Sequence, residues 1–279
     1  MKALTLNIHS HYRNMNKLLF HCNVESFSKM VLEQDVDIIA LQECSQTHKA
    51  VVVHEEQLRS FVAGSGDTVI KDDNCAYLIV KKLRENGKIY EWTWCAPKLG
   101  YDYYDEGMAI ISKYPILQVE EFYSSKLQDY FNWKTRKIIG IKVQTEQGPK
   151  WVYSIHMGWW DDEEEPFIDQ MERIKGHIEM KGDPIFLMGD FNSDAGVRNE
   201  GYDYVKNLGW FDTYHLAEMK DDGSTVIGNI DGWEGKEVNK MRIDHIWINE
   251  KIDVKESRVV FSGESEPVIS DHYGVMITI

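Results

Sequence analysis

The sequence predicts an α/β protein of the α+β kind, in which two β-sheets pack face to face and helices cover them from outside. Short apolar runs rich in Ile, Val and Tyr recur along the whole chain, whereas helical periodicity is found in only a few segments. The chain has 279 residues, 43% of them hydrophobic, and can bury a sizeable core. Because no stretch is rich enough in Gly or Pro to act as a linker, we expect a single domain over residues 1–279.

The predicted elements follow the periodicity of the apolar residues. Strands are predicted at residues 3–8, 37–42, 76–80, 108–111, 137–143, 152–155, 185–188, 243–248, 254–261 and 275–279. Helices are predicted at residues 24–33 and 166–180, where apolar residues recur every three or four positions, and residues 47–60 also fit a helix. The strands outnumber the helices, which favours stacked sheets over a helical bundle.

The chain is acidic, and this limits the partners that it can bind. The net charge is −15 and the pI is about 5.1, and Lys and Arg form no run longer than Lys81-Lys82. Proteins that bind nucleic acid usually carry a basic surface, which replaces the counterions of the phosphate backbone. A small phosphorylated molecule could still enter one local site. The charge therefore favours a small substrate and weighs against nucleic acid.

The four cysteines, Cys22, Cys44, Cys75 and Cys95, contain no Cys-x-x-Cys pair, so neither a zinc ribbon nor a thioredoxin motif is present. The first residues, MKALTLNIHSHY, lack the apolar run of a signal peptide, and no apolar stretch of about 18 residues predicts a membrane span. We therefore expect reduced thiols, no membrane partner and a cytoplasmic location.

Polar residues recur where the apolar strands end. They are Asn7, Glu43, His156, Asp190, Asn192, Asp244, His245, Asp271 and His272. Each alone has an ordinary explanation, because Asn and Asp favour turns and a lone Glu is usually on the surface. Together they supply carboxylates for a hard cation, imidazoles, and acids that orient the imidazoles. Strand ends at one edge of a sheet often build an active site, because the scaffold holds them rigidly.

Seven motifs carry a resemblance to a known family. They are LTLNIH at 4–9, IIALQE at 38–43, DEGMAIISKYPI at 105–116, YSIHMG at 153–158, PIFLMGDFNSD at 184–194, RIDHIWI at 242–248 and SDHYGV at 270–275. In this order they resemble the endonuclease/exonuclease/phosphatase superfamily, whose fold is DNase I-like. The resemblance implies a four-layer α/β/β/α sandwich with two mostly antiparallel sheets. It also implies hydrolysis of phosphate esters with the help of a divalent metal.

The resemblance implies a metal site and a residue that activates water. Glu43 matches the family's principal metal-binding glutamate, with Asn7 and Asp271 near the metal. Asp190 matches the aspartate that orients or deprotonates the attacking water, and Asn192 matches its partner. Carboxylate and amide oxygens suit Mg²⁺ or Mn²⁺.

Two histidines and an arginine complete the implied catalytic set. His272 matches the catalytic histidine and would be oriented by Asp244. His156 matches a second histidine, which in DNase I-like members is paired with a glutamate, and Glu106 is the expected counterpart. Both histidines would hydrogen-bond to phosphoryl oxygens, and one of them would protonate the leaving group. Arg136 resembles a basic residue often found at the start of its strand, and we expect it to contact substrate.

One position departs from the family pattern. Some members carry an acidic residue or Asn two places after the position of Asn7, where this chain has His9. Residues i and i+2 share a strand face, so His9 is expected to point into the site and contact substrate. A zinc site at His9 and His11 is a weaker interpretation, because the surrounding carboxylates and amides suit Mg²⁺ or Mn²⁺ better.

Aromatic and acidic residues near the motifs bear on the substrate. We interpret Trp159, Trp160 and Trp233 as candidate substrate-binding residues, although large aromatics also simply pack at sheet edges. The acidic run at 161–165 suits the first turn of a helix. The segment HMGWWDDEEEPF at 156–167 is similar to a bacterial branch of the superfamily that includes maltose 6'-phosphate phosphatases.

The leading interpretation is a metal-dependent phosphatase that acts on a small phosphorylated metabolite such as a sugar phosphate. The first alternative is a phosphodiesterase, either a nuclease or a phospholipid-type enzyme. A nuclease should show a basic groove, and a lipid enzyme a secretion signal or an apolar hairpin; neither pattern is found in the sequence. A non-catalytic binding module is the remaining alternative, but such a protein would be expected to lack one of the catalytic residues.

Overall fold

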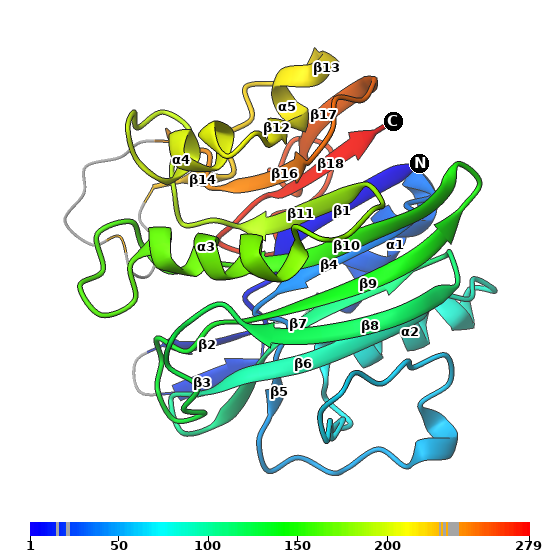
Figure 1. Cartoon of the computed structure of the whole chain (residues 1–279). Helices are drawn as coiled ribbons and strands as arrows, with labels where there is room; N and C mark the ends of the chain where they lie inside the picture. The colour runs from blue at the N-terminus through cyan, green and yellow to red at the C-terminus, as the bar shows by residue number, and fades with distance from the viewer. Residues whose placement is uncertain (15–16, 21–22, 229, 231–232, 234–239) are drawn as a thin grey trace.

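The computed structural model describes residues 1–14, 17–20, 23–228, 230, 233 and 240–279 (Figure 1). Its strands are β1 (Lys2–Asn7), β2 (His11–Asn14), β3 (Lys17–Phe20), β4 (Ile38–Gln42), β5 (Gln46–Thr47), β6 (Glu91–Gly100), β7 (Tyr104–Ser112), β8 (Ile116–Tyr123), β9 (Lys137–Thr145), β10 (Gly148–His156), β11 (Ile185–Asp190), β12 (Phe211–Asp212), β13 (Ala217–Lys220), β14 (Val226–Ile227), β15 (Lys240–Met241), β16 (Asp244–Ile248), β17 (Val254–Val260) and β18 (Gly274–Thr278). Its helices are α1 (Val24–Gln34), α2 (Cys75–Glu85), α3 (Phe167–Ile178), α4 (Gly201–Asn207) and α5 (Thr213–Leu216), with a 3₁₀ turn at Glu55–Gln57.

Two large sheets carry most of the chain. The first has the order β13-β17-β18-β1-β4-β7-β5, with β6 also paired to β7, and the second has the order β12-β16-β11-β10-β9-β8. Their strands pair antiparallel except for β1 with β4, β13 with β17 and β10 with β11. The predicted pair of mostly antiparallel sheets is therefore confirmed.

The sheets stack with helices outside, as the four-layer prediction requires. Apolar residues from both sheets, among them Ile38, Ile139 and Phe186, form the core between them. Helices α1 and α2 pack on the outer face of the first sheet, and α3 and α4 on the outer face of the second. Figure 1 shows α3 on one side of the sandwich and α1 with α2 on the other. Along each strand every second side chain points into the space between the sheets, and these side chains from both sheets fill the central layer.

One predicted strand is wrong. Residues 76–80 belong to helix α2, whose first turn is capped by Asn74, since the Asn74 side chain accepts a hydrogen bond from the Tyr77 N–H at 3.0 Å. The apolar residues Ala76, Ile79 and Leu83 recur at helical spacing and are buried against the first sheet. A short apolar run does not distinguish a strand from the buried face of a helix, which explains the error.

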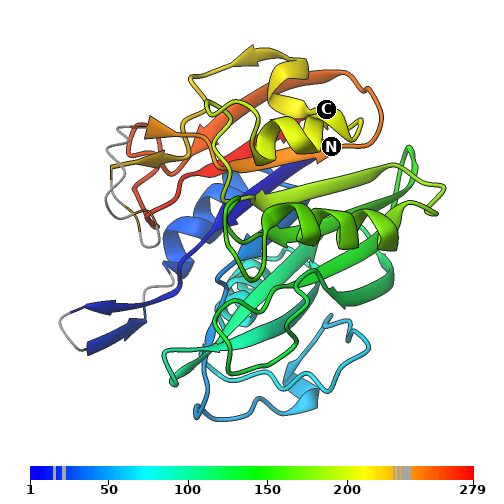
Figure 2. The ribbon, with the colours of Figure 1, turned by 60° about the vertical axis from the view of Figure 1, so that its left-hand side comes forward.

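Residues 47–60 do not form the helix that their pattern fits. They contain only the end of β5 and the 3₁₀ turn, and the rest is irregular. Strands β6 and β8 were not predicted, nor was the two-stranded sheet of β2 and β3, which extends away from the sandwich (Figure 2). The predicted helices at 24–33 and 166–180 are confirmed as α1 and α3.

A buried polar cluster joins the two sheets beneath the strand ends. Gln42 on β4 donates from Nε2 to Ser154 Oγ on β10 at 2.9 Å, and it also bonds to Thr5 on β1. Ser154 Oγ in turn donates to the Leu41 carbonyl at 3.0 Å. Because a buried polar group is stable only when it is hydrogen-bonded, these bonds fix the relative position of the sheets.

The cysteines only partly follow the prediction. Cys44 and Cys95 are buried free thiols, but Cys75 takes part in a disulfide, so the expectation of four reduced thiols is wrong. Disulfides persist mainly in oxidising compartments, and the cytoplasmic location, which rested in part on reduced thiols, loses that support. Among the described residues, no helix is long and apolar enough to cross a membrane.

Candidate active site

The candidate catalytic residues meet at one edge of the sandwich because their strands end there. Strands β1 and β4 run parallel, so Asn7 and Glu43 leave the first sheet side by side. In the second sheet His156 pairs with Asp190, and Asp190 pairs with Asp244. The two sheets touch at this edge, where Asn7 Nδ2 donates to Asp190 Oδ2 at 3.2 Å.

Asp190, His272 and Asp244 form a buried row of alternating charge. His272 Nδ1 donates to Asp244 Oδ2 at 2.9 Å, and His272 Nε2 lies 3.8 Å from Asp190 Oδ2. All three side chains are shielded from solvent. Burial alone lowers the pKa of His272, but the carboxylates of Asp244 and Asp190 outweigh it and hold that pKa well above its usual range. His272 is therefore a cation at neutral pH.

Asp190 is positioned to act on water. Its Oδ1 accepts a hydrogen bond from the Asn192 N–H at 2.8 Å, and its Oδ2 accepts from Asn7. Burial raises the pKa of Asp190, and the positive charge of His272 offsets only part of this increase. A carboxylate with a raised pKa is a better base near neutral pH, so Asp190 can accept a proton from a water molecule.

Glu43 is the carboxylate whose surroundings best fit a divalent cation. It accepts a hydrogen bond from Asn7 Nδ2 at 2.9 Å and faces the cleft. Burial raises the pKa of Glu43; the charge of His9 opposes this, and the carboxylates of Glu106 and Asp271 raise it further. Acids that converge in this way are stabilised by a hard cation, and oxygen donors are the ligands that Mg²⁺ and Mn²⁺ prefer. The residues present therefore fit the predicted metal.

The row of Asp190, Asp244 and His272 also brings three potential ligand atoms within 4.8 Å of one another. We interpret it as a proton-handling group rather than the metal site, because His272 already uses Nδ1 to bind Asp244. A histidine held as a cation by two carboxylates has no free lone pair for a metal.

Three site residues have strained backbones. His9, Glu43 and Asn192 have φ angles of 42°, 47° and 46°, in the left-handed region that non-glycine residues rarely adopt. Such positions cost about 1 kcal/mol or more each and cluster at functional sites. The neighbouring Gly189 has φ 150°, and a Cβ there would lie 2.0 Å from the Ile155 carbonyl oxygen. The glycine of the GDFN motif is thus required for β10 and β11 to approach each other.

Asn192 is held from two sides. Its Nδ2 donates to the Met157 carbonyl at 2.9 Å, and its Oδ1 accepts from Trp233 Nε1 at 3.2 Å. Trp233 is buried beside Ile230 and is not among the residues that line the cleft. Its predicted contact with substrate is therefore not supported, and the structure gives it a supporting role behind Asn192.

His156 and Glu106 do not form the predicted pair. His156 Nε2 lies 3.8 Å from Asp190 Oδ2 and 4.0 Å from Glu43 Oε1, whereas Glu106 forms an ion pair with Lys98 at 3.0 Å. Lys98 lies opposite Glu106 on the neighbouring strand β6, which explains why Lys98 forms the ion pair with this carboxylate. The sequence pattern missed Lys98 because it belongs to none of the motifs.

Burial and two neighbouring cations determine the protonation of His156. Burial lowers the pKa of His156, and the positive charges of Arg136 and Lys98 lower it further, well below its usual value. His156 is neutral at pH 7, so it can donate one hydrogen bond but cannot act as a general acid. Of the two predicted histidines, only His272 carries a positive charge.

His9 points into the cleft, as predicted, and binds Asp271. The two groups form an ion pair at 2.8 Å. Burial lowers the pKa of His9, but the hydrogen bond to Asp271 and the charge of Glu43 raise it overall to about 9. Asp271, which was predicted near the metal, therefore already neutralises a cation, and its role toward the metal stays a prediction.

The polar residues form the floor of a cleft of about 730 Å³ with aromatic walls. Trp133 and Trp159 lie with their ring centres 5.8 Å apart, and Phe131 and Tyr101 are largely exposed at the rim. The predicted Trp159 thus lines the cleft, and its buried Nε1 has no hydrogen-bond partner among the described residues. Arg136 also lines the cleft, as predicted.

Trp160 is not brought to the cleft. Its ring packs against Phe167 of α3 and Tyr204 of α4, on the outer face of the second sheet. Trp159 lines the cleft, whereas Trp160 lies on the other side of the loop that follows β10. The prediction that Trp160 binds substrate is therefore not supported.

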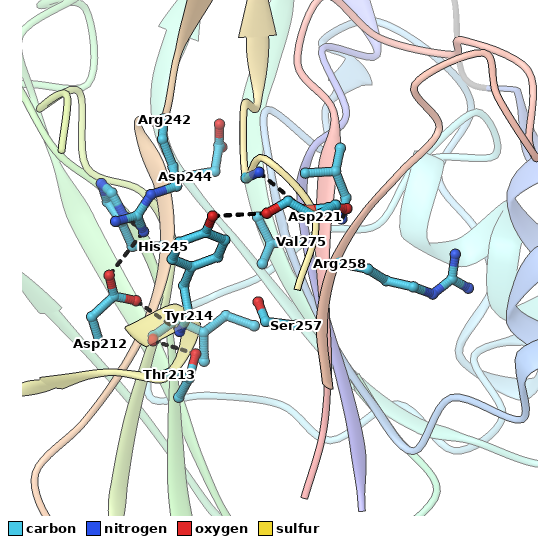
Figure 3. Close-up of a pocket in the computed structure, with 13 residues that line it drawn as sticks. Asp212, Thr213, Tyr214, Asp221, Arg242, Asp244, His245, Ser257, Arg258 and Val275 are labelled. Carbon is cyan, nitrogen blue, oxygen red and sulfur yellow. Dashed lines mark hydrogen bonds and ion pairs between the residues drawn. The ribbon is translucent and has the colours of Figure 1, made fainter. Parts of the chain in front are cut away.

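His245 also lies outside the site, behind Asp244. Its Nε2 lies 3.0 Å from the Ser193 carbonyl oxygen, and its Nδ1 lies 3.0 Å from Arg242 Nη1. These partners require a neutral ring with the proton on Nε2, because a carbonyl only accepts and a guanidinium only donates. Arg242 is paired with Asp212 at 2.9 Å, and Figure 3 shows Arg242 between Asp212 and His245. This group braces the strand that carries Asp244.

Comparison with known proteins agrees with this geometry. The family model described as "Endonuclease/Exonuclease/phosphatase family" matches residues 4–272. The chain belongs to this family. A family protein from Leptotrichia buccalis has 30% identity and a TM-score of 0.85, covering 100% of this chain and 99% of its own. No match was found among curated protein sequences.

More distant family members differ in what they act on. A mannosyl-6-phosphatase from Bacteroides thetaiotaomicron has 17% identity and a TM-score of 0.63, covering 100% of this chain and 98% of its own. The 3' phosphatase NExo from Neisseria, bound to product DNA hairpin, has 17% identity and a TM-score of 0.59, covering 100% and 99%. At this identity they show the shared fold alone. Members of the family hydrolyse phosphoesters with a divalent metal, and the described part of this chain contains a buried cluster of two aspartates and a histidine.

Proposed function

We propose that this chain is a Mg²⁺- or Mn²⁺-dependent phosphatase that acts on a small phosphorylated metabolite such as a sugar phosphate. The observation that carries the proposal is the shape of the cleft: a polar catalytic floor lies under aromatic walls in about 730 Å³. That space suits a molecule of one or two rings. A phosphoryl group on the floor would leave the rest of the substrate beside the wall that Trp133 and Trp159 form together.

Asp190 and His272 would act on the same side of the phosphorus. Asp190 takes a proton from water, the oxygen of that water attacks phosphorus, and the bond to the ester oxygen breaks. His272 Nε2 is only 3.8 Å from Asp190, whereas an in-line leaving group departs from the opposite side. His272 therefore donates to a phosphoryl oxygen and is not placed to protonate the leaving group. This assigns the two residues different tasks at one face of the reaction.

Glu43 and His156 would also border the phosphoryl group, and His156 Nε2 lies 3.8 Å from Asp190 Oδ2, the same distance as His272 Nε2. A Mg²⁺ held by Glu43, when bound, would neutralise charge on the phosphoryl and leaving oxygens. Neutral His156 would donate its single N–H to a phosphoryl oxygen. His9 adds a positive charge beside Glu43.

The aromatic walls favour a sugar over a long polymer. Aromatic faces stack on the apolar faces of sugar rings, and Trp133, Trp159 and the exposed Phe131 line the cleft. The net charge of −15 opposes a nucleic acid chain. We propose no membrane partner.

The proposal is tested by phosphate release from a panel of phosphoesters with Mg²⁺ or Mn²⁺. The panel contains monosaccharide and disaccharide phosphates, nucleotides, bis(p-nitrophenyl) phosphate, and DNA with a 3' phosphate. We expect metal-dependent release from a sugar phosphate that falls by about 10²–10⁴ in the Asp190→Asn variant. Cleavage of the diester or of DNA with sugar phosphates untouched would contradict the proposal and favour a phosphodiesterase or nuclease.

A further inference from the structure

Lys98 is a buried cation in the cleft that belongs to no family motif discussed above. It lies on β6, where the ladder with β7 shifts: Cys95 pairs with Met108 and Lys98 with Glu106, so β6 holds one extra residue. Such a bulge bends a strand and changes the direction of its side chains. The Lys98 side chain is 7% exposed and lines the cleft.

Lys98 and Arg136 are held together by one carbonyl. The Trp133 carbonyl oxygen accepts from Lys98 Nζ at 2.8 Å and from Arg136 Nη1 at 2.9 Å. Because both cationic nitrogens donate to the same oxygen, the two side chains lie next to each other. Both are buried, and their positive charges repel each other. Burial and the charge of Arg136 lower the pKa of Lys98 to about 8. Buried cations with a lowered pKa cluster at functional sites, which makes this pair a candidate for binding an anion.

The pair has donors left over for a ligand. Lys98 uses two of its three N–H groups, for Glu106 at 3.0 Å and for Trp133. Arg136 Nη1 donates to the Trp133 and Thr135 carbonyls, and Nε is fully buried, so Nη2 is the nitrogen left for a ligand among the described contacts of Arg136. Glu106 forms an ion pair with Lys98, whereas Arg136 has no ion pair with a carboxylate among the described residues, so its guanidinium has no carboxylate in direct contact.

We propose that Lys98 and Arg136 form a clamp for a phosphoryl dianion, and that Lys98 makes the cleft prefer phosphate monoesters to diesters. This inference rests on the proposed phosphatase function and deepens it. A monoester carries a charge near −2 at pH 7, whereas a diester carries one negative charge and offers one fewer ionised oxygen. A second buried cation therefore favours the monoester, because the diester leaves part of the clamp unpaired.

The test uses two substrates with one leaving group, p-nitrophenyl phosphate and methyl p-nitrophenyl phosphate, at pH 7 with Mg²⁺. In Lys98→Met, we expect kcat/KM for the monoester to fall by about 10- to 100-fold, the range for loss of one hydrogen bond to a charged group. The diester value should change by less than about threefold. Equal losses for both substrates, or no loss for the monoester, would overturn the role of Lys98.

Two further variants serve as controls for this test. Lys142→Met is the matched control, because Lys142 pairs with Asp183 at 2.7 Å outside the cleft and should leave both substrates unchanged. Lys98→Met alone leaves the Glu106 carboxylate without its cation and could reduce stability. The double variant Lys98→Met with Glu106→Gln removes both charges, and the clamp predicts the same selective loss for it, with thermal unfolding as the check on folding.

Binding of inorganic phosphate separates this inference from the proposed function. Calorimetry with Mg²⁺ present should show phosphate binding about 10- to 100-fold weaker in Lys98→Met than in the wild type, while dimethyl phosphate binding is unchanged. If the wild type cleaves only diesters, the proposed phosphatase function is wrong. The measurement of phosphate binding would then still test whether Lys98 and Arg136 bind a phosphoryl dianion. Phosphate affinity that does not depend on Lys98 would refute it.

Discussion

Replacement of Asp244 by Asn tests whether His272 must be a cation. The substitution keeps the shape of the side chain and removes the charge that lies 2.9 Å from His272 Nδ1. Both groups are buried, so water screens this contact little. A hydrogen bond between charged groups contributes about 1.5–3 kcal/mol, and each 1.4 kcal/mol is a factor of ten. We therefore expect kcat/KM at pH 7 to fall by roughly 10- to 100-fold.

The pH dependence identifies the cause of that loss. In the wild type, activity requires Asp190 as a base and His272 as a cation, so it should decline at low pH and again at high pH. Because Asp244 holds the pKa of His272 above its usual range, Asp244→Asn should move the alkaline decline of kcat/KM to lower pH. Asp212→Asn is the matched control, since it removes a buried carboxylate outside the cleft. An alkaline decline that stays in place would refute the reasoning.

Three further predictions address the metal, stability and the backbone. In the wild type, Mg²⁺ at 100 times its Kd should stabilise the fold by about 2.7 kcal/mol, and in Glu43→Gln this stabilisation, measured as a rise in melting temperature, should largely disappear. Burial, and after it the charge of Arg242, lower the pKa of His245 to about 4. The neutral His245 ring therefore contributes fully to the stability of the fold above pH 6.5, and this contribution is lost as the pH falls toward 4. Denaturant titrations should show the wild type losing about 3 kcal/mol more than His245→Asn over that range; equal slopes would contradict this. Gly189→Ala should cost about 3–5 kcal/mol or prevent folding, measured by chemical denaturation, because its Cβ meets the Ile155 carbonyl; a stable variant would show that β10 and β11 can separate.

The sequence was sufficient for the parts of the site that lie at strand ends. Asn7, Glu43, Asp190 and Asp244 follow or begin apolar runs, and parallel or paired strands bring their ends together once the sheets are stacked. The same logic fails for α2, whose apolar face has the composition of a strand. The local sequence pattern thus predicts which residues lie at the edge of a sheet better than it predicts whether a segment is a helix or a strand.

The parts that could not be predicted depend on tertiary contacts. Lys98 takes Glu106 because a bulge places the two opposite each other, and the sequence gives no sign of that bulge beyond Pro97. The consequence reaches further than one ion pair, because His156 lacks its expected acid and the charge of Lys98 helps to keep it neutral. A family pattern supplies residue types at positions, whereas the protonation of each group depends on which neighbours it meets.

The charge distribution explains how an acidic protein can bind an anion. Lys98, Arg136, His9 and His272 line one cleft together with the carboxylates of Glu43, Asp102, Glu106, Asp190 and Asp271, while the chain as a whole carries −15. A divalent cation at Glu43 would offset part of this negative charge, and the low dielectric of the cleft strengthens the attraction between a phosphoryl group and the cations that it contacts. A long polyanion would also have to lie along the outer surface, where the negative field repels it. The same charges that make the site attractive to a phosphoryl group therefore restrict it to substrates that fit wholly within about 730 Å³.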